Sequence, residues 1–300
     1  MGLTSGQMQL IEAIAENDSS HYRVLAVNCL KEDSTKQNQS FVRKYIEKLN
    51  ISKIDIPHNL NDKLVCFDIN SFQAGRYYLS ENNKSIFDSI VKTAHVADKL
   101  NKMGINFKNT TLLYGLSDTG KTMFCRYIAY KLGLPLYYLN FSNLIDSYMG
   151  KTAQNINLIF NFVKQYDCML LIDELDCIAT KRKSGGQSGA DAEIERITIS
   201  IMQELDNLSN KTIVIGATNR LDIVDDALLR RFSNKKEFSP FSKKENIDMI
   251  KLFIENTHTE SYFTEDEIND IIDKLTTQGS IITKLTQILV NKLYAEEKNL

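Results

Sequence analysis

The sequence has no long apolar run, no recognisable targeting segment and no strong charge of either sign. No apolar stretch approaches the roughly 18 residues of a transmembrane helix, so we expect no membrane-spanning segment. The first residues carry neither the basic block nor the apolar block of a signal peptide. Gly2 is not followed by Ser or Thr at position 6, so the N-myristoylation pattern is absent too.

Paired cysteines are also absent, and the charge is nearly balanced. The five cysteines form no C-x-x-C pair, and their odd number favours reduced thiols in a cytoplasmic protein. They are Cys29, Cys66, Cys125, Cys168 and Cys177. The formal net charge of −2 argues against a dedicated nucleic-acid binder, although a local basic patch would be compatible with it. A chain of 300 residues with 43% hydrophobic residues predicts a globular protein of about two domains.

A glycine-bounded loop lies between an apolar run and an amphipathic helix. It fits the pattern G-x-x-x-x-G-K-S/T, in which successive backbone N–H groups surround a nucleotide phosphate. Lys121 would reach the β- and γ-phosphates, and the Thr122 hydroxyl would hold Mg²⁺. The helix that follows would direct the positive end of its dipole at the phosphates. The expected nucleotide-binding residues are Gly115, Leu116, Ser117, Asp118, Thr119, Gly120, Lys121, Thr122 and Met123.

The flanks of this loop support a nucleotide site over an ordinary glycine turn. Residues 111–114 read as a short strand. Phe124, Ile128 and Leu132 recur at helical spacing, and Gly133 is placed to end that helix. A strand, a loop and a helix in this order are the context that phosphate-binding loops require.

Two acids follow a second apolar run. Residues 168–172 read as a buried strand, and Asp173 and Glu174 come directly after it. Acids at this point suit a Mg²⁺ site at the carboxyl edge of an open α/β sheet. Asp173 would accept hydrogen bonds from the water shell of Mg²⁺, and Glu174 would act as the general base on an attacking water. A solvated acidic turn is the alternative, and the neighbouring phosphate loop disfavours it.

A third apolar run, residues 213–217, ends in polar and then basic residues. Asn219 could hold the attacking water or the γ-phosphate, although Asn is also common in simple turns. Further along, Arg230 and Arg231 follow a short helix pattern. They could be solvated cations at a helix end. They could instead be arginine fingers that act on the γ-phosphate bound by a neighbouring subunit.

The order of apolar segments predicts an α/β fold with a parallel sheet covered on both faces. Strands are expected at 110–114, 135–140, 168–173, 212–217 and 235–238. Helices are expected from Ser80 to about Leu100 and, after Pro240, at 243–256, 264–275 and 278–297. We expect four parts: a helical N-terminal domain at 1–55, a connector at 56–82, an α/β nucleotide-binding domain at 83–239 and a helical lid domain at 240–300. The N-terminal helices could pack on one another or serve as a docking module.

Taken together, these motifs resemble the AAA clade of the AAA+ ATPases over roughly residues 84–297. The resemblance implies a five-stranded parallel sheet, ATP and Mg²⁺ as cofactors, and a homo-oligomer, typically a hexamer. It identifies residues 115–122 as the Walker A loop, 169–174 as the Walker B strand, and Thr218 with Asn219 as sensor 1. It also makes Arg230 and Arg231 the arginine fingers; followed by Phe232, they resemble the katanin, spastin and vacuolar-sorting ATPase subgroup. Gln278, Gly279 and Ser280 stand where this clade begins its last lid helix, in place of a sensor 2 arginine.

A further segment resembles the first pore loop of this family. Tyr148, Met149 and Gly150 form an aromatic, hydrophobic and glycine step, which in relatives grips an extended polypeptide in the central channel. Aromatic contact tolerates many sequences, as a translocating motor requires. A core tyrosine at a helix end is the alternative.

One departure concerns the phosphate loop. The family usually has Pro-Pro-Gly where this chain has Leu116, Ser117 and Asp118. A carboxylate near bound phosphates should weaken nucleotide binding unless it points away. Asp tolerates unusual backbone angles, so the loop can still form.

Three functions follow from these observations. The favoured one is ATP hydrolysis coupled to remodelling, unfolding or disassembly of an unknown protein substrate through a hexamer pore, without a membrane. The second is a nucleic-acid-associated ATPase of the helicase-loader type, which the pore-loop resemblance and the slight negative charge oppose. The third is a nucleotide-dependent scaffold that does not hydrolyse ATP; Asp118 favours it, and the intact Lys121, Glu174, Asn219 and Arg231 oppose it.

Overall fold

The computed structural model describes residues 4–15, individual positions between 25 and 45, and residues 56–298 except 106, 140, 142–150, 179–188 and 209–211. The strands are β1 (Leu64–Phe67), β2 (Thr110–Tyr114), β3 (Leu136–Leu139), β4 (Cys168–Ile172), β5 (Thr212–Thr218) and β6 (Asn234–Glu237). Helices in these ranges are α1 (Ser5–Ala15), α4 (Glu81–Lys102), α5 (Lys121–Leu132), α6 (Lys151–Val163), α7 (Leu175–Ile178), α8 (Gly189–Asp206), α9 (Asp226–Leu229), α10 (Lys243–Thr257), α11 (Glu265–Lys274) and α12 (Gln278–Lys298).

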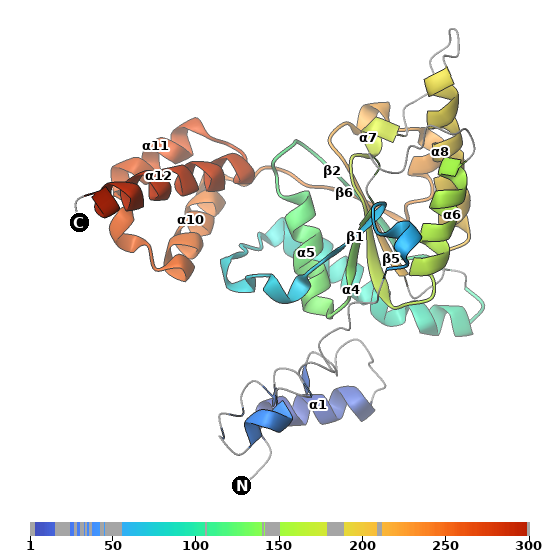
Figure 1. Ribbon diagram of the computed structural model, residues 1–300, viewed down its shortest axis with the longest axis horizontal. Helices are drawn as coiled ribbons and strands as arrows, with labels where there is room; N and C mark the ends of the chain where they lie inside the picture. The colour runs from blue at the N-terminus through green and yellow to red at the C-terminus, as the bar shows by residue number, and fades with distance from the viewer. Residues whose placement is uncertain are drawn as a thin grey trace.

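The six strands form one sheet in the order β1-β3-β4-β5-β2-β6 (Figure 1). The five predicted strands are confirmed, and they run parallel to one another. The predicted strand number was wrong by one, because β1 pairs antiparallel with β3 and adds an edge strand. This strand has only four residues and lies in the segment predicted as a connector, whose β character at residues 64–67 gave no sign that it joins the main sheet.

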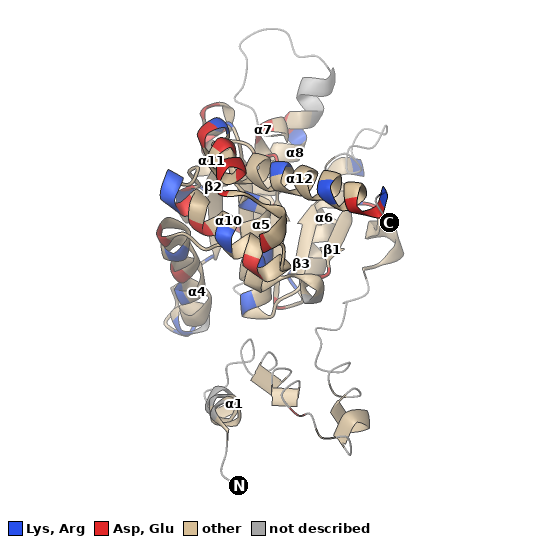
Figure 2. Ribbon diagram, turned by 90° about the vertical axis from the view of Figure 1, so that its left-hand side faces the viewer, with Lys and Arg blue, Asp and Glu red and all other residues tan. Residues whose placement is uncertain are grey.

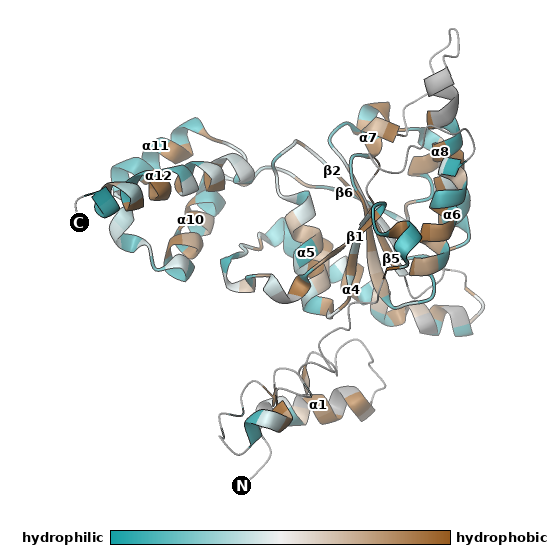
Figure 3. Ribbon diagram, in the orientation of Figure 1, coloured by the Kyte–Doolittle hydropathy of each residue, from teal (hydrophilic) through white to brown (hydrophobic). Residues whose placement is uncertain are grey.

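Helices cover both faces of the sheet, as the apolar strands require. Figure 1 shows α4 and α5 on one face and α6 and α8 on the other, and Figure 3 shows apolar strands between them. Successive residues of one strand serve opposite layers: Met169 and Leu171 pack towards α5, whereas Leu170 and Ile172 pack towards α6 and α8. The sheet is therefore buried on both sides, and its functional surface lies at its edges.

The helix that follows the phosphate loop has the predicted form. Phe124, Ile128 and Leu132 of α5 are buried, and Gly133 ends the helix in the left-handed conformation. Its backbone N–H donates to carbonyls of the last turn, which is the usual role of glycine at a helix C-terminus. Ser80 accepts a hydrogen bond from the Asn83 N–H at the start of α4, as predicted for an N-cap.

The C-terminal helices α10, α11 and α12 pack around an apolar core of their own, which includes Ile250, Ile271 and Ile281. Capping boxes at Ser242 and Thr264 fix where α10 and α11 begin. Figure 2 shows acidic and basic residues interspersed over these helices, so the face seen there carries no single dominant charge. These helices form the helical C-terminal region that the sequence predicts, and we refer to it as the lid.

The N-terminal region is described only in part, and its packing stays a prediction. In α1, the apolar residues Met8, Ile11 and Ile14 are each more than half exposed. Among the described helices of the chain, none combines the length and the apolar character needed to cross a bilayer.

Candidate nucleotide-binding site

Three neighbouring strands deliver the predicted site residues to one edge of the sheet. In the register of the sheet, Tyr114 at the end of β2 lies opposite Thr218 at the end of β5. Ile172 at the end of β4 lies opposite Gly216 of β5. The phosphate loop, the acids after β4 and Asn219 after β5 therefore meet at the carboxyl edge, as parallel strands require.

The phosphate loop has the backbone conformation that its glycines permit. Gly115 has a φ of 151° and Gly120 a φ of 91°, both in the region that favours glycine. A Cβ at position 115 would lie 2.3 Å from the Phe238 carbonyl oxygen, so only glycine fits beside β6 there. Asp118 also has a positive φ, of 61°, a conformation that Asp tolerates better than most residues. The loop thus forms despite its unusual sequence.

Lys121 is buried and points back into the loop that precedes it. Its ammonium donates to the carbonyl oxygens of Gly115 and Leu116, at 2.9 and 2.7 Å, and to Asn219 Oδ1 at 2.8 Å. The side chain of Asn219 is thus linked directly to the lysine expected to bind phosphate. Burial lowers the pKa of Lys121, and nearby carboxylates, chiefly that of Asp173, oppose this effect.

Thr122 and Asp173, the two predicted Mg²⁺ residues, are hydrogen-bonded to each other. The Thr122 hydroxyl donates to Asp173 Oδ2 at 2.8 Å, while Asp173 Oδ1 accepts from the Glu174 backbone N–H at 2.9 Å. Glu174 has a φ of 54°, a strained conformation for a residue with a side chain, and its side chain is exposed. Both carboxylate oxygens of Asp173 are therefore held by hydrogen bonds, whereas Glu174, the expected general base, faces solvent.

Asp176 is a site residue that the sequence reasoning missed. Its Oδ1 accepts from the Thr218 hydroxyl at 2.7 Å and from the Asn219 N–H at 3.2 Å. This carboxylate joins α7, which follows the acids, to the end of β5. The second aspartate in the run Asp-Glu-Leu-Asp was the available signal, and only its hydrogen bonds to the end of β5 show its role.

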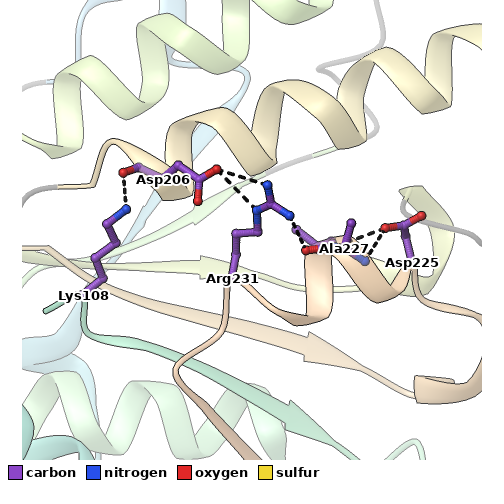
Figure 4. Close-up of polar contacts among 6 residues, drawn as sticks. Lys108, Asp206, Asp225, Ala227 and Arg231 are labelled. Atoms are coloured by element: carbon purple, nitrogen blue, oxygen red, sulfur yellow. Dashed lines mark hydrogen bonds and ion pairs between the residues drawn. The ribbon is translucent and has the colours of Figure 1, made fainter. Parts of the chain in front are cut away.

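The two arginines lie at the opposite edge of the sheet. Figure 4 shows the Arg231 guanidinium between Asp206 and the Ala227 carbonyl. Its Nη2 lies 3.2 Å from Asp206 Oδ2, and its Nη1 donates to the Ala227 oxygen at 2.8 Å. Lys108 holds the Asp206 carbonyl from the other side. Arg230 is exposed beside this cluster, so the structure does not bring either arginine to the phosphate loop of its own chain.

A cavity of about 680 Å³ lies between the phosphate loop, the segment after β1 and the lid. It is lined on one side by Gly120 and Met123, and on the others by Ile69, Tyr77 and Gln278. Its size and apolar walls suit a nucleoside. The sequence reasoning missed the walls from residues 67–78 and 278–283, because these segments meet only in the folded chain.

Comparison with known proteins identifies the domain that carries these residues. The family model described as "ATPase family associated with various cellular activities (AAA)" matches residues 111–240. Residues 111–240 are an AAA ATPase domain. The match includes the Walker A loop, the acids after β4, Asn219 and both arginines.

Relatives of the AAA domain include a proteasome regulatory subunit and an ATP-dependent metalloprotease. The 26S proteasome regulatory subunit 6A of Saccharomyces cerevisiae is 32% identical over 64% of this chain and 44% of its own length. The ATP-dependent zinc metalloprotease FtsH 1 of Alkaliphilus metalliredigens is 33% identical over 61% of this chain and 31% of its own length. An uncharacterized AAA family ATPase, y4kL of Sinorhizobium fredii, is 32% identical over 61% of this chain and 50% of its own length. The chain thus spans about half the length, or less, of these curated relatives.

The AAA domain contacts the lid through its phosphate loop. The Gly279 N–H in the first turn of α12 donates to the Asp118 carbonyl at 2.8 Å. A Cβ at position 279 would lie 3.1 Å from Asp118 Cγ, so the Asp118 carboxyl group packs against this turn. Negative charge is favoured at a helix N-terminus, which gives this carboxylate a stabilising neighbour outside the phosphate loop.

The predicted pore-loop residues of the AAA domain, Tyr148, Met149 and Gly150, lie outside the described residues. Helix α6 begins directly after them, at Lys151. Their role therefore stays a prediction.

Proposed function

We propose that this chain binds ATP with Mg²⁺ and hydrolyses it, and that a homohexamer uses the energy to remodel a protein substrate through its pore. The observation that carries the proposal is the direct linkage of Lys121 to Asn219 and of Thr122 to Asp173 at one edge of the sheet. The exposed Glu174 directly follows Asp173 in the chain.

Each side chain has a distinct part in the chemistry. The Lys121 ammonium would exchange its present acceptors for phosphate oxygens, which releases Asn219 Oδ1 to hold the attacking water. Glu174 would take the proton from that water as general base. Because this carboxylate is exposed and not engaged in the Thr122–Asp173 pair, it is free to meet a water on the substrate side.

The oxygen donors present fit Mg²⁺. Mg²⁺ usually keeps several waters and is bound through one or two protein oxygens plus substrate phosphates. Thr122 Oγ1 and Asp173 Oδ2, already 2.8 Å apart, supply such a pair. When bound, Mg²⁺ would neutralise charge that develops on the phosphate oxygens.

The position of Arg231 supports action between subunits. The Thr110 hydroxyl donates to the Arg231 carbonyl at 2.9 Å, and Thr110 begins β2. Gly115 follows the other end of β2, about 15 Å away at the rise of a parallel strand. The side chain is held there by Asp206, at the edge where the strands start. Arg231 would therefore act on ATP bound by the next subunit of a ring.

A protein substrate is favoured over nucleic acid. Relatives with comparable identity are named as proteasome subunits and a metalloprotease. The overall charge of −2 gives no electrostatic footprint for nucleic acid. Tyr148, Met149 and Gly150 would supply the grip on an extended polypeptide.

Phosphate release tests the proposal and separates the alternatives. The full chain should release phosphate from ATP, and an unfolded protein should stimulate this more than single-stranded DNA does. Stimulation by DNA alone would favour the helicase-loader type. Tight ATP binding without any phosphate release would favour a scaffold.

Substitution of the predicted pore aromatic tests how substrate is engaged. Tyr148→Ala should leave basal phosphate release and oligomer size unchanged, and should remove the stimulation by unfolded protein. A core tyrosine would behave differently, since loss of a buried aromatic costs about 3–5 kcal/mol of stability. A large drop in melting temperature would therefore contradict the pore assignment.

A further inference from the structure

Gln278 begins α12 and lines the cavity beside the phosphate loop, but its side chain is not satisfied there. The residue is 6% exposed. Neither its Nε2 nor its Oε1 has a hydrogen-bond partner among the residues that the structure describes. Gly120 of the phosphate loop and Met123 of α5 line the same cavity.

A buried amide without partners is unfavourable for stability alone. Buried polar groups in folded proteins are nearly always hydrogen-bonded, and an unpaired one carries its full desolvation penalty. Much of the cavity wall is apolar and includes Ile69, Phe253 and Ile282. An apolar side chain at position 278 would suit these neighbours better, so the amide points to a polar ligand that enters the cavity.

The structure assigns to Gln278 the recognition of the adenine base, an inference that rests on the proposed binding of ATP at this site. A glutamine amide pairs with adenine through two hydrogen bonds: the N6 amino group donates to Oε1, and Nε2 donates to N7. Guanine presents a carbonyl oxygen and N7 along the same edge, so Oε1 would face an oxygen and one bond would be lost. Gln278 is thereby the residue that favours ATP over GTP.

Arg126 is the other lining residue that has a buried side-chain nitrogen or oxygen without a partner in the described structure. Its guanidinium lies over the Phe67 ring, 4.1 Å from the ring centroid. Arginine offers donors only, so it cannot accept a hydrogen bond from the amino group of adenine. Of the two, only Gln278 combines a donor with an acceptor.

The test compares nucleotides that differ at the recognised edge. Equilibrium affinities of the full chain for ADP, GDP and 7-deaza-ADP are measured by calorimetry. Wild type should prefer ADP to GDP by about 5- to 150-fold, the range expected for one bidentate base contact. It should also bind ADP more tightly than 7-deaza-ADP, which lacks the N7 acceptor.

Gln278→Met, which has similar length and no hydrogen-bonding amide, should bind the three nucleotides with nearly equal affinity. Its melting temperature without nucleotide should be equal to or above that of wild type, whereas a purely structural glutamine would leave a less stable protein and an unchanged ADP preference. Gln278→Leu provides a second apolar variant should the first not fold. Gln287→Ala, an exposed position on the same helix, is the matched control and should behave as wild type.

The outcomes separate this inference from the proposed function. Equal binding of ADP and GDP by wild type, or an unchanged preference in both apolar variants, would overturn the role of Gln278 alone. Absence of binding of any nucleotide by wild type would overturn the proposed function as well.

Discussion

Lys121 and Glu174 lie at the same edge of the sheet in contrasting surroundings. Lys121 is 7% exposed, and three oxygens surround its ammonium. Glu174 is exposed, at a strained backbone position. A buried cation suits the binding of phosphate once phosphate oxygens replace its present acceptors. An exposed carboxylate at the same edge suits proton transfer to and from water.

The first prediction separates binding from hydrolysis. Lys121→Ala should lose ATP binding, because the phosphate charge is left uncompensated. Glu174→Gln should keep ATP binding and hydrolyse at least ~100-fold more slowly, as expected after loss of a general base. Filter binding and phosphate release measure the two properties. Glu297→Gln, a surface change on α12, is the control, and near-normal turnover by Glu174→Gln would refute its catalytic role.

A second prediction concerns Gly216 in β5. A Cβ there would lie 2.6 Å from Phe232 Cζ and 2.7 Å from Leu175 Cδ1, both in the buried core. Gly216→Ala should therefore destabilise the protein by about 1–3 kcal/mol, the usual effect of overpacking. Chemical denaturation measures the change. In a Phe232→Leu background, Gly216→Ala should lower the free energy of unfolding by less. An equal decrease in both backgrounds would show that contact with Phe232 is not the cause.

At the scale of helices and strands, most elements of the α/β fold could be predicted from short stretches of sequence. The apolar runs of β4 and β5 predict buried parallel strands, and both were confirmed. The side-chain cap Ser80 predicts where α4 begins, and this was confirmed too. Each of these signals is local, so each can be read from a few consecutive residues.

Elements that depend on distant partners could not be predicted in this way. Residues 64–67 have β character in the sequence, but their antiparallel pairing with β3 at the edge of the main sheet is visible only in the fold. Likewise, Arg231 is held by Asp206 from another helix. The unpaired amide of Gln278 becomes informative only when its burial is known. Long-range contacts of this kind leave no repeating pattern in the sequence. The phosphate loop does leave one, because its own backbone conformation fixes the spacing of its glycines and its lysine.

The third prediction belongs to the contact between the phosphate loop and α12. Gly279→Ala would place a methyl group 3.1 Å from Asp118 Cγ, so the loop or the helix must shift. We expect weaker ATP binding and slower phosphate release, with little change in unfolding free energy. Asp118→Gly keeps the positive φ and removes the obstructing carboxyl group. The double variant should regain ATP binding and phosphate release. If it does not, the methyl group at position 279 acts through a contact other than Asp118.

At the scale of the whole molecule, the proposed nucleotide site and the proposed arginine finger lie at opposite edges of one sheet. The phosphate loop follows the end of β2, and Arg231 is hydrogen-bonded to the start of β2. A side chain cannot reach across the length of a buried strand to its own nucleotide. If Arg231 acts as proposed, a complete site therefore requires at least two copies of the chain.

The fourth prediction follows from this separation. Arg231→Ala and Lys121→Ala should each be inactive alone, since the first lacks the finger and the second lacks nucleotide. Mixed assemblies should regain part of the phosphate release, because some interfaces pair an intact pocket with an intact arginine. Co-purified mixed oligomers of two tagged variants provide the measurement. No recovery in such oligomers would argue against action between subunits.

The hydrogen bond from Gly279 to Asp118 connects the phosphate loop directly to the first turn of the long helix α12. Helix α12 has 21 residues, which corresponds to about 30 Å. A tilt of about ten degrees at its first turn would move its far end by about 5 Å, since displacement grows with the length of a rigid helix. That end exposes Val290, Leu293 and Tyr294. A small movement of the phosphate loop would thus produce a larger displacement of an apolar surface far from the nucleotide.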